Sequence, residues 1–295
     1  MPISQAATRS RSTAGATVQV VDLPYGWTFA VLCLLQGVLV AASWQYPVRL
    51  GRSRLVGLAV PVVVFFIGLA ATRGADWATE AISHLATFGT PVAAAAVGVV
   101  WGWRRPWVYA LAAPVAWVIA WRADSLAGDA ASVALIAGAC LTLAAIIAMC
   151  TPPWALAAGL VALAIVDSIL VFTDQVRPGT QALHAVIPPS VGGTPLPALQ
   201  DATFGRSLFG WLDILAPALG ATLLAGMTRR RVAAAALTAI AALALGLLLV
   251  VTRQVPGTIP PLLAVIAWGL ASRRRPPGAM PTMWMAASPH PAEPG

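Results

Sequence analysis

The sequence predicts an all-α polytopic membrane protein with nine transmembrane helices, and three observations lead to this fold class. Of the 295 residues, 59% are hydrophobic and 9% are charged, and the mean hydropathy is +0.82. This composition excludes a water-soluble globular domain. The apolar residues gather in runs of about 15 to 22, a length that spans a bilayer. Arginine and tryptophan residues mark the ends of these runs, as they do at membrane interfaces.

Each apolar run is expected to form one helix, and the breaks between runs carry Arg, Pro or acidic residues. The expected helices cover residues 25–46, 55–72, 82–103, 107–121, 130–149, 154–172, 208–227, 232–251 and 258–271. We therefore expect a membrane domain over residues 23–272, flanked by disordered tails at 1–22 and 273–295. The connection over residues 173–207 is the one long loop, and loops of this length are commonly functional.

The basic residues predict how the chain is oriented in the cell membrane. The net charge of +8 would suit nucleic acid, but the arginines lie at the ends of apolar runs, so we expect lipid and no nucleic acid as a partner. Alternate loops carry clusters of arginine without acidic residues among them: Arg49, Arg52 and Arg54, then Arg104 and Arg105, Arg229 to Arg231, and Arg273 to Arg275. The positive-inside rule places these clusters in the cytoplasm. The N-terminus and the 173–207 loop are then extracytoplasmic, and the C-terminus is cytoplasmic.

Two acidic residues lie inside apolar runs, where they are costly. Asp213 is five residues into the run that begins at Leu208, and Asp167 is five residues before Phe172. A carboxylate near the centre of a membrane helix costs roughly 2.5 to 3.5 kcal/mol on insertion scales. At 1.5 Å rise per residue, each acid lies about 7 to 8 Å below the surface that carries the long loop. Equal depth on antiparallel neighbours predicts that the two acids form one site.

A proline-rich stretch enters the last helix from the same surface. It reads PGTIPPLLAV from Pro256, and Pro260 and Pro261 are expected in the first helical turn, where a missing amide hydrogen is tolerated. Two apposed carboxyl groups in a pocket of low dielectric constant would share one proton. Such a pair can activate water with one member and protonate a carbonyl oxygen with the other.

These residues resemble the motifs of the intramembrane aspartyl proteases, the family of presenilin and signal peptide peptidase. That family carries Tyr-Asp in its sixth helix, Gly-x-Gly-Asp followed by Pro in its seventh, and Pro-Ala-Leu at the start of its ninth. The counterparts here are Val166-Asp167, then Gly210-Trp211-Leu212-Asp213 with Pro217, then Pro260-Pro261-Leu262.

The resemblance implies a presenilin-like arrangement of nine helices and an aspartic endopeptidase activity. It makes Asp167 and Asp213 the catalytic residues, and it assigns contacts with substrate to Gly210, Leu212, Pro260, Pro261 and Leu262. The orientation matches signal peptide peptidase, so the implied substrates are transmembrane helices, such as signal-peptide remnants, with a cytoplasmic N-terminus. No cofactor, metal or accessory subunit is expected.

Three departures from the family motifs leave two other functions open. Val166 replaces the tyrosine, Leu212 the second glycine and Pro261 the alanine. Because a glycine beside an acid permits close approach of a backbone, Leu212 motivates one alternative, a catalytically silent protein that binds helices without cutting them. A proton- or cation-coupled transporter that uses the same acids is the other alternative. A zinc metalloprotease is excluded because the chain has no H-E-x-x-H motif.

Overall fold

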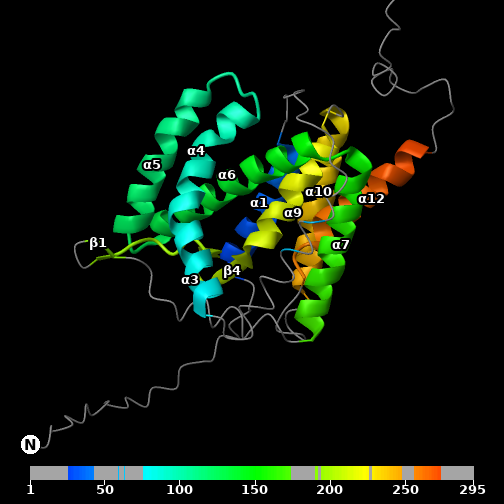
Figure 1. Cartoon of the computed structure of the whole chain (residues 1–295). Coiled ribbons are helices and arrows are strands. Elements are labelled where there is room, and N and C mark those ends of the chain that lie inside the picture. The colour runs from blue at the N-terminus through cyan, green and yellow to red at the C-terminus, as the bar shows by residue number, and fades with distance from the viewer. Residues whose placement is uncertain are drawn as a thin grey trace, which may run out of the picture.

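The computed structural model describes residues 26–42, 59, 63, 76–173, 190–191, 194–225, 228–247 and 256–273, and Figure 1 shows the whole chain. Both expected tails lie outside the described residues, apart from Arg273, which ends the last helix. All but two residues of the expected second span, 55–72, also lie outside them.

The described part of the chain is mainly helical, as expected of a membrane protein. Three helices are long and apolar enough to cross a membrane, namely Thr79–Val100, Leu126–Cys150 and Pro153–Phe172. The helices are α1 (Trp27–Ala41), α3 (Asp76–His84), the π-helical turn η1 (Leu85–Gly89), α4 (Thr90–Val100), α5 (Pro106–Arg122), α6 (Leu126–Cys150), α7 (Pro153–Phe172), α9 (Trp211–Leu223), α10 (Thr228–Gly246) and α12 (Ile259–Arg273). Since α3, η1 and α4 are continuous, the described residues form eight helices.

Proline and polar residues set several helix boundaries, and α6 begins four residues before its expected start at residue 130. Pro106 and Pro153 each begin a helix, because the first position needs no amide donor and proline already has a helical φ. Ser125 precedes α6 in an extended conformation, and Asp129 lies in the first turn, where a negative charge interacts favourably with the helix dipole.

Two small antiparallel sheets lie among the described residues of the expected long loop and of the start of the next expected helix. Strands β1 (Ser190–Val191) and β2 (Thr194–Pro195) pair with each other, as do β3 (Asp201–Phe204) and β4 (Ser207–Gly210). The expected helix start at Leu208 is therefore wrong: residues up to Gly210 belong to β4, and α9 begins at Trp211. The physical reason is the pairing with β3, which holds the chain extended up to Gly210 (φ −70°, ψ 161°).

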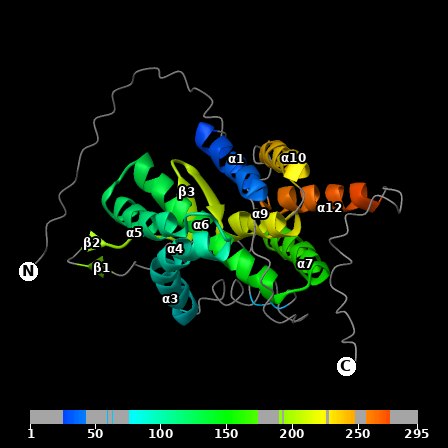
Figure 2. The ribbon, with the colours of Figure 1, turned by 90° about the horizontal axis from the view of Figure 1, so that it is seen from above.

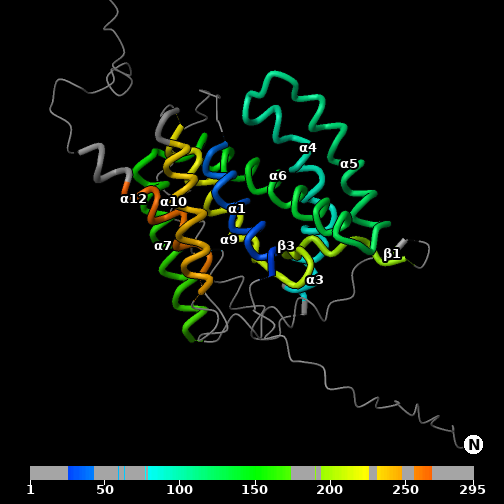
Figure 3. The backbone as a smooth tube through the Cα atoms, turned by 180° about the vertical axis from the view of Figure 1, so that it is seen from behind, coloured from blue at the N-terminus to red at the C-terminus, as the bar shows by residue number. Residues whose placement is uncertain are grey.

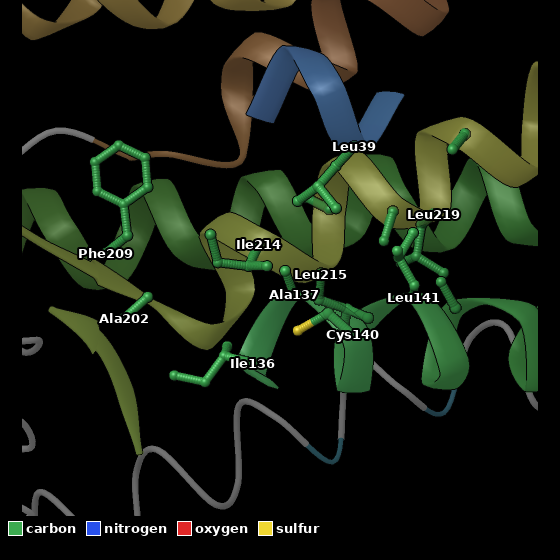
Figure 4. Packing of buried hydrophobic residues seen from close by; sticks show 14 of the residues in the cluster. Leu39, Ile136, Ala137, Cys140, Leu141, Ala202, Phe209, Ile214, Leu215 and Leu219 are labelled. Atoms are coloured by element: carbon green, nitrogen blue, oxygen red, sulfur yellow. The ribbon is translucent and has the colours of Figure 1, made fainter. Parts of the chain in front are cut away.

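Helix α9 is the centre of the bundle. It contacts α1, α6, α7 and α12, and these helices surround it when the molecule is seen from above (Figure 2). Seen from behind, α4 and α5 lie on one side of this centre, whereas α7, α10 and α12 lie on the other (Figure 3). The apolar core includes Ile214, Leu215 and Leu219 of α9, Cys140 of α6 and Leu39 of α1 (Figure 4).

The β3–β4 hairpin is attached to two helices at its turn. Gly205 adopts a left-handed conformation (φ 59°), and its backbone N–H donates a hydrogen bond to Asp129 Oδ2 of α6 at 2.8 Å. The hydroxyl groups of Thr28 in α1 and Ser207 in β4 form a buried hydrogen bond of 2.9 Å. These contacts hold the strand that leads directly into α9.

We predict that Gly205→Ala destabilises the protein. A left-handed backbone costs a residue with a Cβ roughly 1 to 2 kcal/mol, and the added Cβ would lie 2.8 Å from Thr28 Cγ2. The thermal unfolding midpoint in detergent should fall by about 2 to 6 °C. Gly220→Ala is the matched control, because its Cβ would meet Val265 Cγ2 at an ordinary 3.6 Å. Equal midpoints for the two variants would contradict the assignment of strain to the hairpin turn.

Candidate functional site

Asp167 lies on α7, five residues before the helix ends at Phe172, and its side chain is buried with 8% exposure. Thr258, which directly precedes α12, provides both of its hydrogen-bond donors. The Thr258 hydroxyl donates to Asp167 Oδ2 at 2.7 Å, and the Thr258 backbone N–H donates to the same oxygen at 3.3 Å. The carboxyl group of α7 is thus bound to the N-terminal end of α12.

Asp213 lies in the first turn of α9 and is half-buried. Its Oδ2 accepts a hydrogen bond of 2.8 Å from the backbone N–H of Gly210, the residue that caps the helix. The backbone N–H of Gly257 is a second donor to this carboxyl group. The sequence placed Asp213 five residues into a helical span, whereas it is the third residue of α9, because β4 occupies the preceding positions.

The two acids meet at the dipeptide Gly257-Thr258. Gly257 donates to Asp213 and its neighbour Thr258 donates to Asp167, and the two carboxyl groups interact electrostatically. Gly257 is a glycine because there is no room for a side chain: an added Cβ would lie 2.5 Å from Cγ of Asp213 and 3.0 Å from its Cβ. Backbone and carboxyl group therefore approach each other closely here.

The other site residues predicted from the sequence lie near the two acids, but only some of them bond an acid. Gly210 caps α9 and bonds Asp213, whereas Leu212 is half-buried and packs against the apolar core. Pro260 and Pro261 are buried in the first turn of α12, and Leu262 packs against the same core.

The residues before these prolines contact the acids, and their importance was missed in the sequence. The motif resemblance assigns contacts to Pro260, Pro261 and Leu262, whereas Gly257 and Thr258 are the residues that bond the acids. The available indication was a glycine followed by a hydroxyl residue where the chain enters the last helix, since glycine permits close approach and threonine donates a hydrogen bond.

A third missed residue is Gln36, an amide side chain in the middle of the apolar helix α1. It is 1% exposed, and its Nε2 donates hydrogen bonds to backbone carbonyls of Asp213 and Gly257. A polar side chain inside an apolar membrane helix commonly bonds a neighbouring helix, so its position in the sequence was the available indication.

The chemistry of the site is that of carboxyl groups. Among the described residues, no group of three or more His, Cys, Asp or Glu side chains is arranged to hold a metal ion. Two carboxyl groups that interact can accept a proton at one and donate a proton from the other. Comparison with protein-family models, with curated proteins and with solved structures finds no match to this chain.

We predict that Thr258→Val destabilises the protein by about 1 to 3 kcal/mol, because the buried Asp167 carboxyl group loses its shorter hydrogen bond. Thr258→Ser keeps the hydroxyl group and should cost less. Thr238→Val is the matched control: Thr238 is fully buried, but its hydroxyl donates only to Ala234 O within its own helix. The measurement is the midpoint of unfolding in detergent. Indistinguishable midpoints for Thr258→Val and Thr258→Ser would contradict a contribution from the hydroxyl group.

Proposed function

We propose that this protein is an intramembrane aspartyl endopeptidase that hydrolyses peptide bonds of transmembrane helices or signal-peptide remnants. One observation carries the proposal: Asp167 and Asp213, from two different helices, are bound by adjacent residues of a single turn. Acids inside apolar helices are costly and mark functional sites. The motifs around both acids and at the start of α12 support the same activity through their resemblance to presenilin and signal peptide peptidase.

In this mechanism the pair holds one proton. The ionised carboxylate takes a proton from a water molecule as the water oxygen forms a bond to the peptide carbonyl carbon, and the protonated carboxyl group donates to the carbonyl oxygen. A carboxyl group then protonates the leaving nitrogen as the C–N bond breaks, while the ionised carboxylate takes a proton from a hydroxyl group of the tetrahedral intermediate. The products are a free carboxyl and a free amino terminus, and the pair again holds one proton. Hydrogen bonds from Gly210, Gly257 and Thr258 orient the two side chains.

The proposed architecture is a presenilin-like set of nine helices, with residues 55–72 as the second. The proposed orientation in the cell membrane follows the arginine clusters, with the N-terminus and the 173–207 loop extracytoplasmic and the C-terminus cytoplasmic. The site then lies toward the extracytoplasmic surface, because Asp167 is near the C-terminal end of α7 and Asp213 near the N-terminal end of α9. Substrate helices would have a cytoplasmic N-terminus.

We predict that Asp167→Asn and Asp213→Asn each abolish cleavage of tagged, signal-peptide-like helices co-expressed with the protein. Each amide removes the group that takes up or donates a proton, so the loss should be at least about 10²-fold. Asp124→Asn, at an exposed acid, is the control that should cleave like wild type. Cleavage that persists in both variants would refute the proposal. Ion flux in reconstituted vesicles that depends on both acids, without cleavage, would favour the transporter instead.

A silent, helix-binding protein remains the second candidate because of Leu212, which directly precedes Asp213 and packs against the core. For an active protease, we predict that Leu212→Gly raises the cleavage rate, since it gives substrate backbone more room beside the acid. Leu212→Ala should give a smaller gain. Purified protein and a fluorescent substrate helix provide both rates. Helix binding without cleavage, in wild type and in both variants, would instead support the silent protein.

A further inference from the structure

Gln36 of α1 connects the two parts of the chain that hold Asp213. Its Nε2 atom donates to the backbone carbonyl of Asp213 at 2.8 Å and to that of Gly257 at 3.1 Å. A side-chain amide nitrogen carries two hydrogen atoms, so both bonds form at once. One side chain on a third helix therefore reaches the start of α9 and the turn before α12.

Prolines remove the usual helical N–H donor of both acceptor carbonyls. In an α-helix the carbonyl of Asp213 would accept from the N–H of the residue four positions later, which is Pro217 and has no N–H. The residues three and four positions after Gly257 are Pro260 and Pro261, so neither a tight turn nor a helical turn can supply a donor there. The prolines leave open the two carbonyls that the amide binds.

The bonding of Gln36 favours a role at the site over a role in packing alone. The Gln36 Oε1 oxygen is buried and has no hydrogen-bond partner among the described residues. The contribution of Gln36 therefore comes from its N–H groups, and an apolar side chain here would leave two backbone carbonyls without this donor. The amide hydrogens, by contrast, bind Asp213 itself and the residue whose N–H bonds the Asp213 carboxyl group.

We propose that Gln36 is a positioning residue of the acid pair. Its amide replaces the two local N–H donors that the prolines lack. It thereby holds the backbone of Asp213 next to the Gly257-Thr258 turn, which binds Asp167. The effect on hydrolysis rests on the proposed protease function. The hydrogen-bonding role does not, and it has its own measurement.

The first measurement is the kinetics of Gln36→Met, which keeps an unbranched side chain of similar length but has no N–H. We expect kcat to fall by about 10- to 100-fold, because a small displacement of a reacting group has effects of this size. KM should change by less than about threefold, since Gln36 is buried and both of its amide hydrogens are bonded to backbone carbonyls. Leu32→Met, at a fully buried position one turn away on α1, controls for methionine packing and should retain wild-type kcat.

The second measurement uses the prolines as suppressors. Pro217→Ala returns an N–H to the Asp213 carbonyl. In the Pro217→Ala background, Gln36→Met should therefore lower kcat less than it does in wild type. It should lower the unfolding midpoint by about half as much as in wild type. Pro114→Ala is the matched control, because it also removes a proline from within a helix, but at an exposed position of α5, which packs against α4 and α6. In the Pro114→Ala background, the effects of Gln36→Met should be the same as in wild type.

The outcomes separate the two proposals. Wild-type cleavage with an unchanged kcat in Gln36→Met overturns the positioning role and leaves the protease function standing. Equal suppression by Pro217→Ala and Pro114→Ala overturns the claim that the amide replaces the missing helix donor. If wild type does not cleave, the protease function fails, while the midpoints of the same variants still decide whether Gln36 is coupled to Pro217.

Discussion

A carboxyl group inside an apolar helix bundle needs hydrogen-bond donors, and the arrangement of this protein follows from where such donors are available. Helix N-termini have backbone N–H groups without intrahelical partners, and their dipoles favour negative charge. Asp213 is bonded within the first turn of α9 by Gly210, and Asp167 is bonded by Thr258 immediately before α12. Two helix N-termini thus converge on the C-terminal part of α7, and this convergence creates the acid pair.

The convergence requires that α9 be packed closely on all sides. Small residues alternate with larger ones along its buried part, including Ala216, Ala218, Gly220 and Ala221, and they allow neighbouring helices to approach. The interdigitated side chains of α9, α6 and α1 in Figure 4 keep the first turn in place. The β3–β4 hairpin also holds the start of α9 in place, because its contacts with α1 and α6 fix the strand that leads into Gly210.

Prolines have a role at this site that goes beyond starting or interrupting helices. Pro217, Pro260 and Pro261 each remove a backbone donor, and the carbonyls left open belong to Asp213 and Gly257. Such carbonyls can accept hydrogen bonds from a different helix, which fixes the relative position of segments far apart in sequence. In this protein the helix is α1, more than 170 residues from its partners along the chain.

The sequence by itself determined the membrane class, the bounds of α5, α7 and α12 to within two residues, and the two acids, because these depend on local composition. Helix α7 begins one residue before its expected start and ends at the expected residue, since Pro152 and Pro153 mark its beginning. The start of α9 was misplaced, because Leu208 and Phe209 are apolar in a strand as they would be in a helix. Only the tertiary structure decided that Gly257, Thr258 and Gln36 meet the acids. Hydrogen bonds between helices depend on which faces pack together, and the spacing of residues along one chain does not encode that pairing.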